Sequence, residues 1–384
     1  MTVRLLYLVS HPIQYQAPML RLIGAEADID LFVLFEDMRT AEAYDDPGFG
    51  QTVEWDVPLT DGYAHGFAKF KEDIAIELEK ADVLWVHGWA SPLKKRALKL
   101  ASEKGVPVLM RGENNQVSMP DGSGLNGMLK RWYLNRIFRH CTGFLCIGSD
   151  NRRYYQEHGI DEAKLFSMPY AVDNQFFRGR VAAAKPNRDA FRAELGLESD
   201  RPVILFAGKL QSRKHPLTLL AAFRELDMES ARHPYLLYVG DGEQRTILET
   251  QSRDMGDRVR VLGFRNQTEL PALYDLADVF VLASDREPWG LAVNEAMNGE
   301  AAVIVSDQCG CAADLIDDTC GRIIPADDAP ALRHALADVL SDPTALTTMG
   351  ENAARRISTW GLAEGVGGLK QALAQILPKS DKNR

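Results

Sequence analysis

Residues 284–297 read SDREPWGLAVNEAM and lie between two elements of different kinds. The apolar run 279–283 before them is typical of a buried strand, and 291–298 has the pattern of a helix. In open α/β sheets, ligands bind beside the loops at the carboxyl ends of the strands. Glu287 in the loop and Glu295 one turn into the helix therefore predict two carboxylates that accept hydrogen bonds from two hydroxyl-bearing parts of one ligand.

The backbone between these two acids also suits a ligand. Gly290 allows the main chain to approach a ligand closely, because it has no side chain. The N–H groups of Leu291 and its neighbours begin the helix, where they can face an anion or a sugar hydroxyl. The alternative is that Glu287 is a solvated loop acid and Glu295 an exposed helix acid, which is the usual situation for an isolated pair at this spacing. The motifs around the stretch favour the ligand site.

Two further loops follow expected strands in the same half of the chain. Gly208 begins the sequence GKLQSRK, which carries Lys209 and Lys214. Two ammonium groups in one loop can stabilise a diphosphate leaving group without a metal. Gly263 and Phe264 end a later strand, where the backbone can hydrogen-bond the edge of a nucleobase. Taken alone, Lys209 and Lys214 are equally typical of solvated surface lysines, and Gly263 and Phe264 of an ordinary turn.

Short apolar runs alternate with helix-like stretches in both halves of the chain. This alternation is typical of a parallel sheet covered by helices on both faces. Strands are expected at 3–9, 29–35, 83–87, 106–110 and 143–147 in the first half, and at 203–207, 235–239, 259–262, 279–283 and 302–306 in the second.

The length of 384 residues exceeds what one compact core usually holds, so two domains are expected. We place the first domain at 1–175 and the second at 201–358. Residues 176–200, which include small residues, charges and a proline, are expected to form an exposed linker. The stretch 360–377 has the pattern of a further helix.

Composition excludes several classes of protein. The chain is 46% hydrophobic and 26% charged, which is typical of a globular protein. Its net charge of −10 argues against duplex nucleic acid as a partner. Its five cysteines show no disulfide framework or zinc spacing, which suits a reducing cytoplasm. We expect no signal peptide, no transmembrane helix and no bound metal, the last because no DxD motif follows a strand.

With these residues in view, the second half resembles the donor-binding domain of family 4 glycosyltransferases, which are retaining enzymes of GT-B fold. The resemblance implies an α/β architecture of two Rossmann-like domains whose parallel sheets face each other across a cleft. It also implies that the C-terminal helix, at about 360–380, returns to the first domain. The motifs that carry the likeness are GKLQSRK at 208–214, GDGE at 240–243, the glycine-containing loop at 263, EPWGLAVNEAM at 287–297, and PYAVD at 169–173 before the linker.

The resemblance also implies roles for the residues of the second half. Lys209 stands where relatives usually have arginine, so the bidentate fork of a guanidinium is absent there. The implied roles are as follows: Gly208, Lys209 and Lys214 at the donor diphosphate, Glu287 at the hydroxyls of the donor sugar, Glu295 at the ribose, Gly290 and Leu291 at the sugar or phosphate, and Gly263 and Phe264 at the base.

The first half is expected to supply the acceptor side. His11, Gln14 and Tyr15 follow the first strand and are candidates for side-chain contacts with the acceptor. His87 and Arg111 end two later strands and are candidates for a catalytic role beside Glu287. Arg111 stands where many relatives have a histidine, and it cannot act as a base at neutral pH. For His87, a structural role in a partly buried position is the open alternative.

The resemblance implies transfer from a nucleotide-diphosphate sugar to an acceptor hydroxyl with retention of the anomeric configuration. A UDP-sugar is expected ahead of a GDP-sugar, with no other cofactor. The acceptor is a carbohydrate, a lipid-linked sugar or a small molecule. Two alternatives stay open: a nucleotide-sugar 2-epimerase of the same fold, and a non-catalytic protein that binds nucleotide sugars.

One basic and aromatic stretch, 128–139, has two interpretations. It reads MLKRWYLNRIFR and suits contact with an anionic membrane, which would serve a lipid-linked acceptor. The alternative is a packed helix with solvated cations. We expect a cytoplasmic protein, with a peripheral place at the inner membrane surface if the first interpretation holds.

Overall fold

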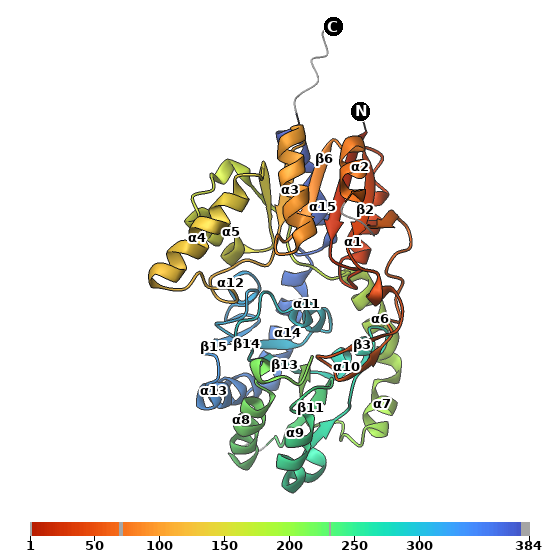
Figure 1. Cartoon of the computed structure of the whole chain (residues 1–384). Helices are drawn as coiled ribbons and strands as arrows, with labels where there is room; N and C mark the ends of the chain where they lie inside the picture. The colour runs from red at the N-terminus through yellow and green to blue at the C-terminus, as the bar shows by residue number, and fades with distance from the viewer. Residues whose placement is uncertain (1, 69–71, 230–231, 378–384) are drawn as a thin grey trace. The chain divides into compact units, whose positions relative to one another are not determined.

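The computed structural model describes residues 2–68, 72–229 and 232–377. It divides the chain into two units, each built on its own parallel sheet (Figure 1). Unit 1 comprises Met1–Tyr44, Pro58–Ala171 and Gly361–Arg384, and unit 2 comprises Asp45–Val57 and Val172–Trp360.

Unit 1 contains a seven-stranded sheet whose strands are all parallel, in the order β5-β2-β1-β6-β7-β8-β9. Strand residues such as Leu5, Val83 and Leu109 are fully buried, as expected for a sheet covered on both faces. The strands are β1 (Val3–Val9), β2 (Ile29–Phe35), β5 (Ala64–Phe67), β6 (Val83–His87), β7 (Val108–Arg111), β8 (Gly143–Cys146) and β9 (Leu165–Ser167). The helices are α1 (Ala17–Gly24), α2 (Asp73–Lys80), α3 (Pro92–Lys104), α4 (Gly124–Phe138), α5 (Ser149–Glu157) and α15 (Leu362–Ile376).

Local signals set the ends of these helices. The Ser91 side chain accepts a hydrogen bond from the Lys94 N–H at 3.1 Å and begins α3, with Pro92 in the first turn. Gly105 ends α3 in the left-handed conformation, with a φ of 71°. The N–H of Val106 then bonds to the carbonyl of Ala101, so β7 begins at Val108 and not at residue 106 as expected.

Helix α15 belongs to unit 1 although it ends the chain. It packs on β9 and α1, and a Cβ on Gly368 would lie 1.6 Å from the carbonyl oxygen of Ser167. Only a glycine permits this close approach of helix to strand. Lys370 adds an ion pair with Glu26 at 2.6 Å. The C-terminal helix therefore packs on the first sheet, as the resemblance implies.

Unit 2 contains a six-stranded parallel sheet in the order β12-β11-β10-β13-β14-β15. One of its apolar clusters joins strands to helices through buried residues such as Phe206, Phe223 and Leu336. The strands are β10 (Val203–Ala207), β11 (Tyr235–Val239), β12 (Val259–Val261), β13 (Val279–Leu282), β14 (Ala302–Ser306) and β15 (Gly321–Ile324). The helices are α6 (Asn174–Ala184), α7 (Arg188–Glu194), α8 (Pro216–Glu229), α9 (Arg245–Gln251), α10 (Leu270–Leu276), α11 (Leu291–Asn298), α12 (Ala312–Leu315), α13 (Ala329–Leu340) and α14 (Pro343–Ile357).

The boundaries of the units differ from the expected ones in two places. Residues 176–200, expected as an exposed linker, form much of α6 and α7 and belong to unit 2. Phe177 is buried against Tyr274 of α10, which explains why this stretch is helical. Residues 45–57, expected within the first domain, also belong to unit 2. They include most of a short hairpin formed by β3 (Tyr44–Asp46) and β4 (Gln51–Val53).

Candidate active site

The sheet of unit 2 has its topological switch at β10, which lies between β11 and β13. Ligands of open α/β sheets bind at such a point, outside the carboxyl ends of the strands. The loop after β10 and the loop after β13 meet there, because the N–H of Asp285 donates to the carbonyl of Arg213 at 2.7 Å. The structure therefore brings the GKLQSRK and EPWGLAVNEAM motifs together.

Glu287 is the centre of this meeting point. It is only 8% exposed, and its carboxylate lies 3.2 Å from Nη1 of Arg213 and in direct contact with Nζ of Lys214. Burial alone would raise the pKa of Glu287, but the nearby charges of Lys214 and Arg213 outweigh it and hold the pKa below its usual value. The carboxylate is thus ionised at neutral pH and flanked by two cations, one of which, Arg213, the sequence reasoning missed.

The backbone after Glu287 has the form expected for a ligand-binding turn. Gly290 has a φ of 100°, which a residue with a side chain rarely adopts, and a Cβ there would lie 2.8 Å from a methyl group of Leu282. Leu291 follows directly as the first residue of α11. The positive end of the helix dipole therefore lies beside the cation cluster, where it favours a bound anion.

Glu295 lies one turn into α11 and is held from the side by α10. Its carboxylate accepts a hydrogen bond from the hydroxyl of Tyr274 at 2.6 Å. Burial raises the pKa of Glu295 to about 7, which the hydrogen bond from Tyr274 only partly offsets. At neutral pH this side chain is therefore a mixture of the acid and the carboxylate, unlike Glu287. Its expected contact with a ribose remains a prediction.

Lys209 has a partner that the sequence did not predict. We call residues 45–57 the strap. Both carboxylate oxygens of Asp46 in the strap accept from Nζ of Lys209, at 2.8 and 3.1 Å. Asp46 also accepts from the N–H groups of Gly48 and Phe49. Burial would raise the pKa of Asp46, but these hydrogen bonds and the Lys209 charge lower it overall.

The strap also covers the loop after β12. Phe264 packs edge-on against Phe49 with ring centroids 4.9 Å apart, and Trp55 lies 6.3 Å from it. The side chain of Asn266 donates to the carbonyl of Glu54 at 2.6 Å. The two loops expected to hold the diphosphate and the base therefore share one neighbouring segment.

The glycines of these loops support their close packing. The N–H of Gly208 donates to the carbonyl of Val239 at 2.9 Å, and the N–H of Gly240 donates to the carbonyl of Gly263 at 2.8 Å. Gly208, Gly240 and Gly263 thus tie the loops after β10, β11 and β12 together along one edge of the sheet.

In unit 1, two of the expected residues, Tyr15 and His87, contact Tyr170, to which the sequence analysis assigned no role. Its hydroxyl donates to Glu113 at 2.8 Å, accepts from Tyr15 at 3.2 Å, and lies 3.3 Å from Nε2 of His87. These side chains come from the carboxyl ends of β1, β6 and β7 and from the segment after β9. The guanidinium of Arg111 lies 4.6 Å from the centre of the Tyr170 ring.

Burial makes most of this cluster electrically neutral. It lowers the pKa of His87 well below the usual value, with the charge of Arg111 acting in the same direction. Burial likewise lowers the pKa of His11, whose Nδ1 lies 2.9 Å from the Ser10 hydroxyl. Burial also raises the pKa of Tyr15 to about 12. His87 is thus an uncharged imidazole at neutral pH.

Arg111 has a different environment from that expected of a catalytic group. It is 1% exposed, and its Nη2 donates to the carbonyls of Met168 and Pro169, both at 3.1 Å. A guanidinium held in this way orients the segment that carries Tyr170, so the structure favours a positioning role. Gln14 is half-buried at the same sheet edge, whereas its neighbour Gln16 is buried and accepts from the Tyr7 hydroxyl at 2.7 Å.

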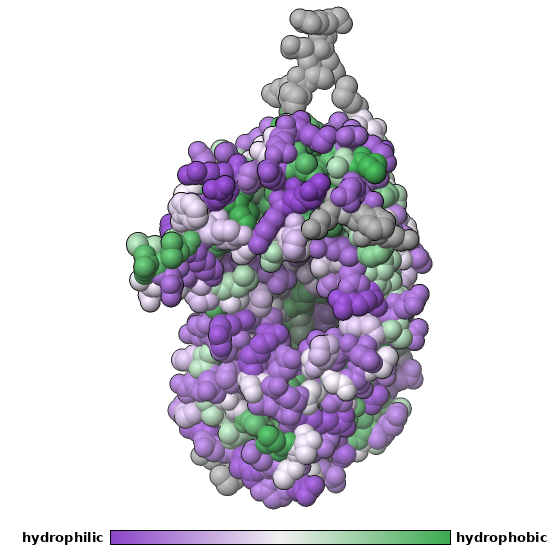
Figure 2. Space-filling view, in the orientation of Figure 1, coloured by the Kyte–Doolittle hydropathy of each residue, from purple (hydrophilic) through white to green (hydrophobic). Residues whose placement is uncertain are grey.

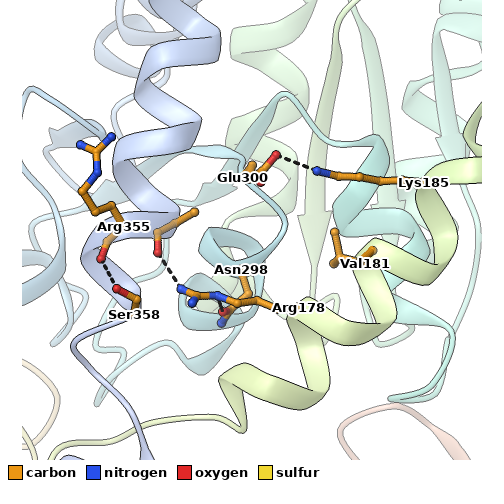
Figure 3. A pocket seen from close by; sticks show the side chains of 9 residues that line it. Arg178, Val181, Lys185, Asn298, Glu300, Arg355 and Ser358 are labelled. Atoms are coloured by element: carbon orange, nitrogen blue, oxygen red, sulfur yellow. Dashed lines mark hydrogen bonds and ion pairs between the residues drawn. The ribbon is translucent and has the colours of Figure 1, made fainter.

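A pocket of about 370 Å³ in unit 2 is lined by none of the residues of the cation cluster (Figure 3). Asn298, at the opposite end of α11 from Gly290, lines it and accepts from Nε of Arg178 at 3.0 Å. Lys185 pairs with Glu300 at 3.0 Å, so the charges around this pocket already have protein partners. It contains none of the residues expected at the donor.

Neither a metal cluster nor a membrane-spanning helix is found in the described part of the chain. Within residues 2–68, 72–229 and 232–377, His, Cys, Asp and Glu form no group of three that could hold a metal ion. Within the same ranges, no helix combines the length and the apolar character that crossing a bilayer requires. All five cysteines are buried and unpaired.

Comparison with known proteins agrees with this geometry. The family described as Glycosyl transferases group 1 matches residues 187–356. The chain is 30% identical over 231 residues to the D-inositol 3-phosphate glycosyltransferase of Kineococcus radiotolerans, which covers 56% of this chain and 52% of that protein. The chain thus spans about half the length of the curated relatives it matches.

Two solved structures share the fold over nearly the whole chain. Sucrose-phosphate synthase from Thermosynechococcus elongatus has a TM-score of 0.69 at 20% identity, covering 97% of this chain and 99% of that one. Anabaena Alr3699/HepE in complex with UDP has a TM-score of 0.71 at 14% identity, covering 97% and 100%. These likenesses confirm the expected GT-B class of two Rossmann-like domains.

Proposed function

We propose that the chain, whose residues 187–356 match the family described as Glycosyl transferases group 1, moves a sugar from a nucleotide diphosphate to an acceptor hydroxyl. The observation that carries this proposal is the contact of Glu287 with Lys214 and Arg213 at the switch point of unit 2. It provides cations for a diphosphate and an ionised carboxylate for sugar hydroxyls in one place.

The chemistry follows from where charge develops. When the bond between the anomeric carbon and the phosphate oxygen breaks, negative charge grows on the diphosphate and positive charge on the sugar ring. Lys214, Arg213 and the N-terminus of α11 stabilise the negative charge, and Lys209 joins them once Asp46 releases it. Glu287 orients the sugar through its hydroxyls.

We propose retention of the anomeric configuration, with the acceptor attacking on the face from which the diphosphate leaves. The donor phosphate then takes the proton of the acceptor hydroxyl, and no side-chain nucleophile is needed. The neutral imidazole of His87 contributes a hydrogen bond to the reacting sugar and not a charge.

For the donor we propose a UDP-sugar ahead of a GDP-sugar, supported by the shared fold with a protein that was crystallised with UDP. The acceptor we propose is the hydroxyl of a carbohydrate, a lipid-linked sugar or a small molecule, with His11, Gln14 and Tyr15 on its side. The reaction fits the cytoplasm, where five unpaired cysteines stay reduced. A peripheral place at the inner membrane surface, through 128–139, is a separate proposal on which the transfer reaction does not depend.

The test is a screen of UDP-, GDP- and ADP-sugars with metal-free protein, followed by product analysis. Donor binding should raise the melting temperature by mass action, and NMR of the product should show the anomeric configuration of the donor. Glu287→Ala should lose transfer by about 100-fold or more, since it removes a group that orients the sugar. Glu225→Ala, an exposed acid on α8, is the matched control.

Three results would contradict the proposal. Full transfer by Glu287→Ala would remove Glu287 from the site. Release of an epimerised nucleotide sugar without any acceptor would favour a 2-epimerase. Tight donor binding by the wild type with no turnover on any acceptor class would favour a non-catalytic binding protein.

A further inference from the structure

Helix α4 of unit 1 has two apolar faces, and only one of them is packed. Leu134, Ile137 and Phe138 are buried against the sheet side of the unit. The opposite face is formed by Leu125, Met128, Leu129, Trp132 and Tyr133, which we call the α4 face. The exposed fractions of four of these side chains are 66% for Leu125, 64% for Met128, 56% for Leu129 and 63% for Trp132.

The spacing of these residues makes them one continuous stripe. Steps of three and four residues along a helix return to the same side, so the five side chains lie in one row over two turns. Figure 2 shows a green, apolar cluster at the left edge, in the place where α4 projects from its neighbours in Figure 1. Single exposed apolar residues are ordinary, but a contiguous stripe marks an interaction surface.

The charges around the α4 face are of one sign. From residue 122 to residue 149 the chain has no Asp or Glu, although its net charge is −10. Arg131 and Arg136 on α4 are exposed, as is Arg139 directly after the helix, and Arg136 lies in the stripe one turn beyond Trp132. Lys95 from α3 lies 5.5 Å from the centre of the Tyr133 ring and adds a further cation beside the stripe.

The acid nearest to the helix in sequence faces inward. Asp121 lies 3.0 Å from Nε2 of His158 and accepts from the Tyr154 hydroxyl at 2.9 Å. Lys130, on the flank of the helix, is held by the carbonyls of Met119 and Pro120. The arginines, and not Lys130, are therefore the cations that remain available to an external partner.

We propose that the α4 face docks on the surface of an anionic phospholipid bilayer. Leucine and methionine side chains would enter the acyl boundary, Trp132 and Tyr133 would lie at the level of the headgroups, and the arginines would pair with lipid phosphates. Charge complementarity selects this occupant, because an apolar row whose own segment, residues 122–149, carries cations and no Asp or Glu matches an anionic interface. The inference goes beyond the transfer reaction, and its failure would leave the proposed function standing.

The experiment is vesicle flotation of the full chain. The wild type should float with phosphatidylcholine–phosphatidylglycerol vesicles and stay in solution with phosphatidylcholine alone. The double variant Leu129→Ser/Trp132→Ser should bind at least roughly tenfold more weakly, since burial of one large apolar side chain is worth about that factor. The double variant Arg131→Gln/Arg136→Gln should bind the vesicles about fivefold or more weakly than the wild type, and its binding should no longer depend on phosphatidylglycerol.

The matched control is Ile76→Ser, which removes an apolar side chain of 53% exposure on α2 of the same unit. It should leave flotation unchanged. Circular dichroism should give the same melting temperature for all variants, because the altered side chains are exposed. Equal flotation of Leu129→Ser/Trp132→Ser and wild type would overturn the proposal, as would a wild type that binds neither vesicle. Light scattering could also show that the wild type is a dimer and that Leu129→Ser/Trp132→Ser is a monomer. That result would assign the α4 face to contact with a second copy of the chain and would overturn the proposal equally.

Discussion

The carboxyl edges of the two sheets carry opposite kinds of chemistry. In unit 2 the edge is ionic, with Glu287 held between Lys214 and Arg213. In unit 1 the edge is mostly aromatic, with the uncharged His87 and Tyr15 joined through the hydroxyl of Tyr170, and with Glu113 and Arg111 beside them. The same sheet architecture thus carries a cluster of charged groups in one unit and a network of aromatic hydroxyl and imidazole groups in the other.

This difference fits the transfer reaction proposed above, because the diphosphate and the hydroxyl groups that it involves need different surroundings. A diphosphate needs fixed cations, whereas a sugar or acceptor hydroxyl needs donors and acceptors that do not compete as charges. Burial keeps these two side chains of unit 1 uncharged, because it lowers the pKa of His87 well below its usual value and raises that of Tyr15 to about 12. We therefore expect changes in unit 1 to affect turnover and changes in unit 2 to affect donor affinity.

Among the variants that test the contrast between the two sheet edges, Tyr170→Phe is expected to have the largest effect on turnover. The change removes the hydroxyl that joins Tyr15, His87 and Glu113, and should lower kcat roughly three- to tenfold, the equivalent of one net hydrogen bond. The Kd for the donor, measured by calorimetry, should stay the same. If Tyr170→Phe instead weakened donor binding and left kcat unchanged, the expected separation of turnover in unit 1 from donor affinity in unit 2 would be wrong. Tyr133→Phe, on α4 of the same unit, is the control.

A smaller effect of opposite sign is expected for Asp46→Asn in the strap. Asp46 occupies Lys209, which a diphosphate would otherwise engage, so removing its charge should tighten donor binding. The expected gain is up to about fivefold, the worth of a partly exposed ion pair. Asp45→Asn, which removes a neighbouring charge that bonds Thr52, should leave the affinity unchanged. Weaker donor binding by Asp46→Asn would show that the strap supports the site and does not compete for it.

The smallest effect concerns the pH dependence of stability. Burial raises the pKa of Glu295 from 4.5 to about 7, so the folded protein holds a proton that the unfolded chain has released. The contribution of this group to the free energy of unfolding is therefore complete below pH 4.5 and is lost as the pH rises towards 7. Glu295→Gln should flatten this part of the stability profile, measured by denaturant titration across that range. An unchanged slope would place Glu295 in a solvated environment.

Sequence patterns predicted the parts of the fold that depend on local periodicity. The alternation of apolar runs and amphipathic stretches placed the main strands of both sheets, and the fold class is confirmed. The start of β7 differed because Gly105 and Val106 complete the end of α3 before the strand begins. The residue at which β7 begins therefore depends on the hydrogen bond of Val106 to α3, which the apolar run does not indicate.

The parts that could not be predicted depend on contacts between distant residues. Asp46 and Lys209 lie 163 positions apart, and residues 45–50 read DDPGFG, which indicates only a turn. Residues 176–200 look like a linker by composition, but Phe177 is buried against α10 and makes the stretch helical. Tyr170 is the hub of its cluster because the segment after β9 reaches the carboxyl ends of β1, β6 and β7, a relation that no motif spacing encodes.

We propose that the cations around Glu287 hold a diphosphate. The most direct test is a calorimetric titration of metal-free protein with UDP, comparing wild type with Lys214→Met. The wild type should bind, and the variant should bind at least about tenfold more weakly, since it loses a hydrogen bond between charged groups. Equal affinity of the two proteins for UDP would contradict the account.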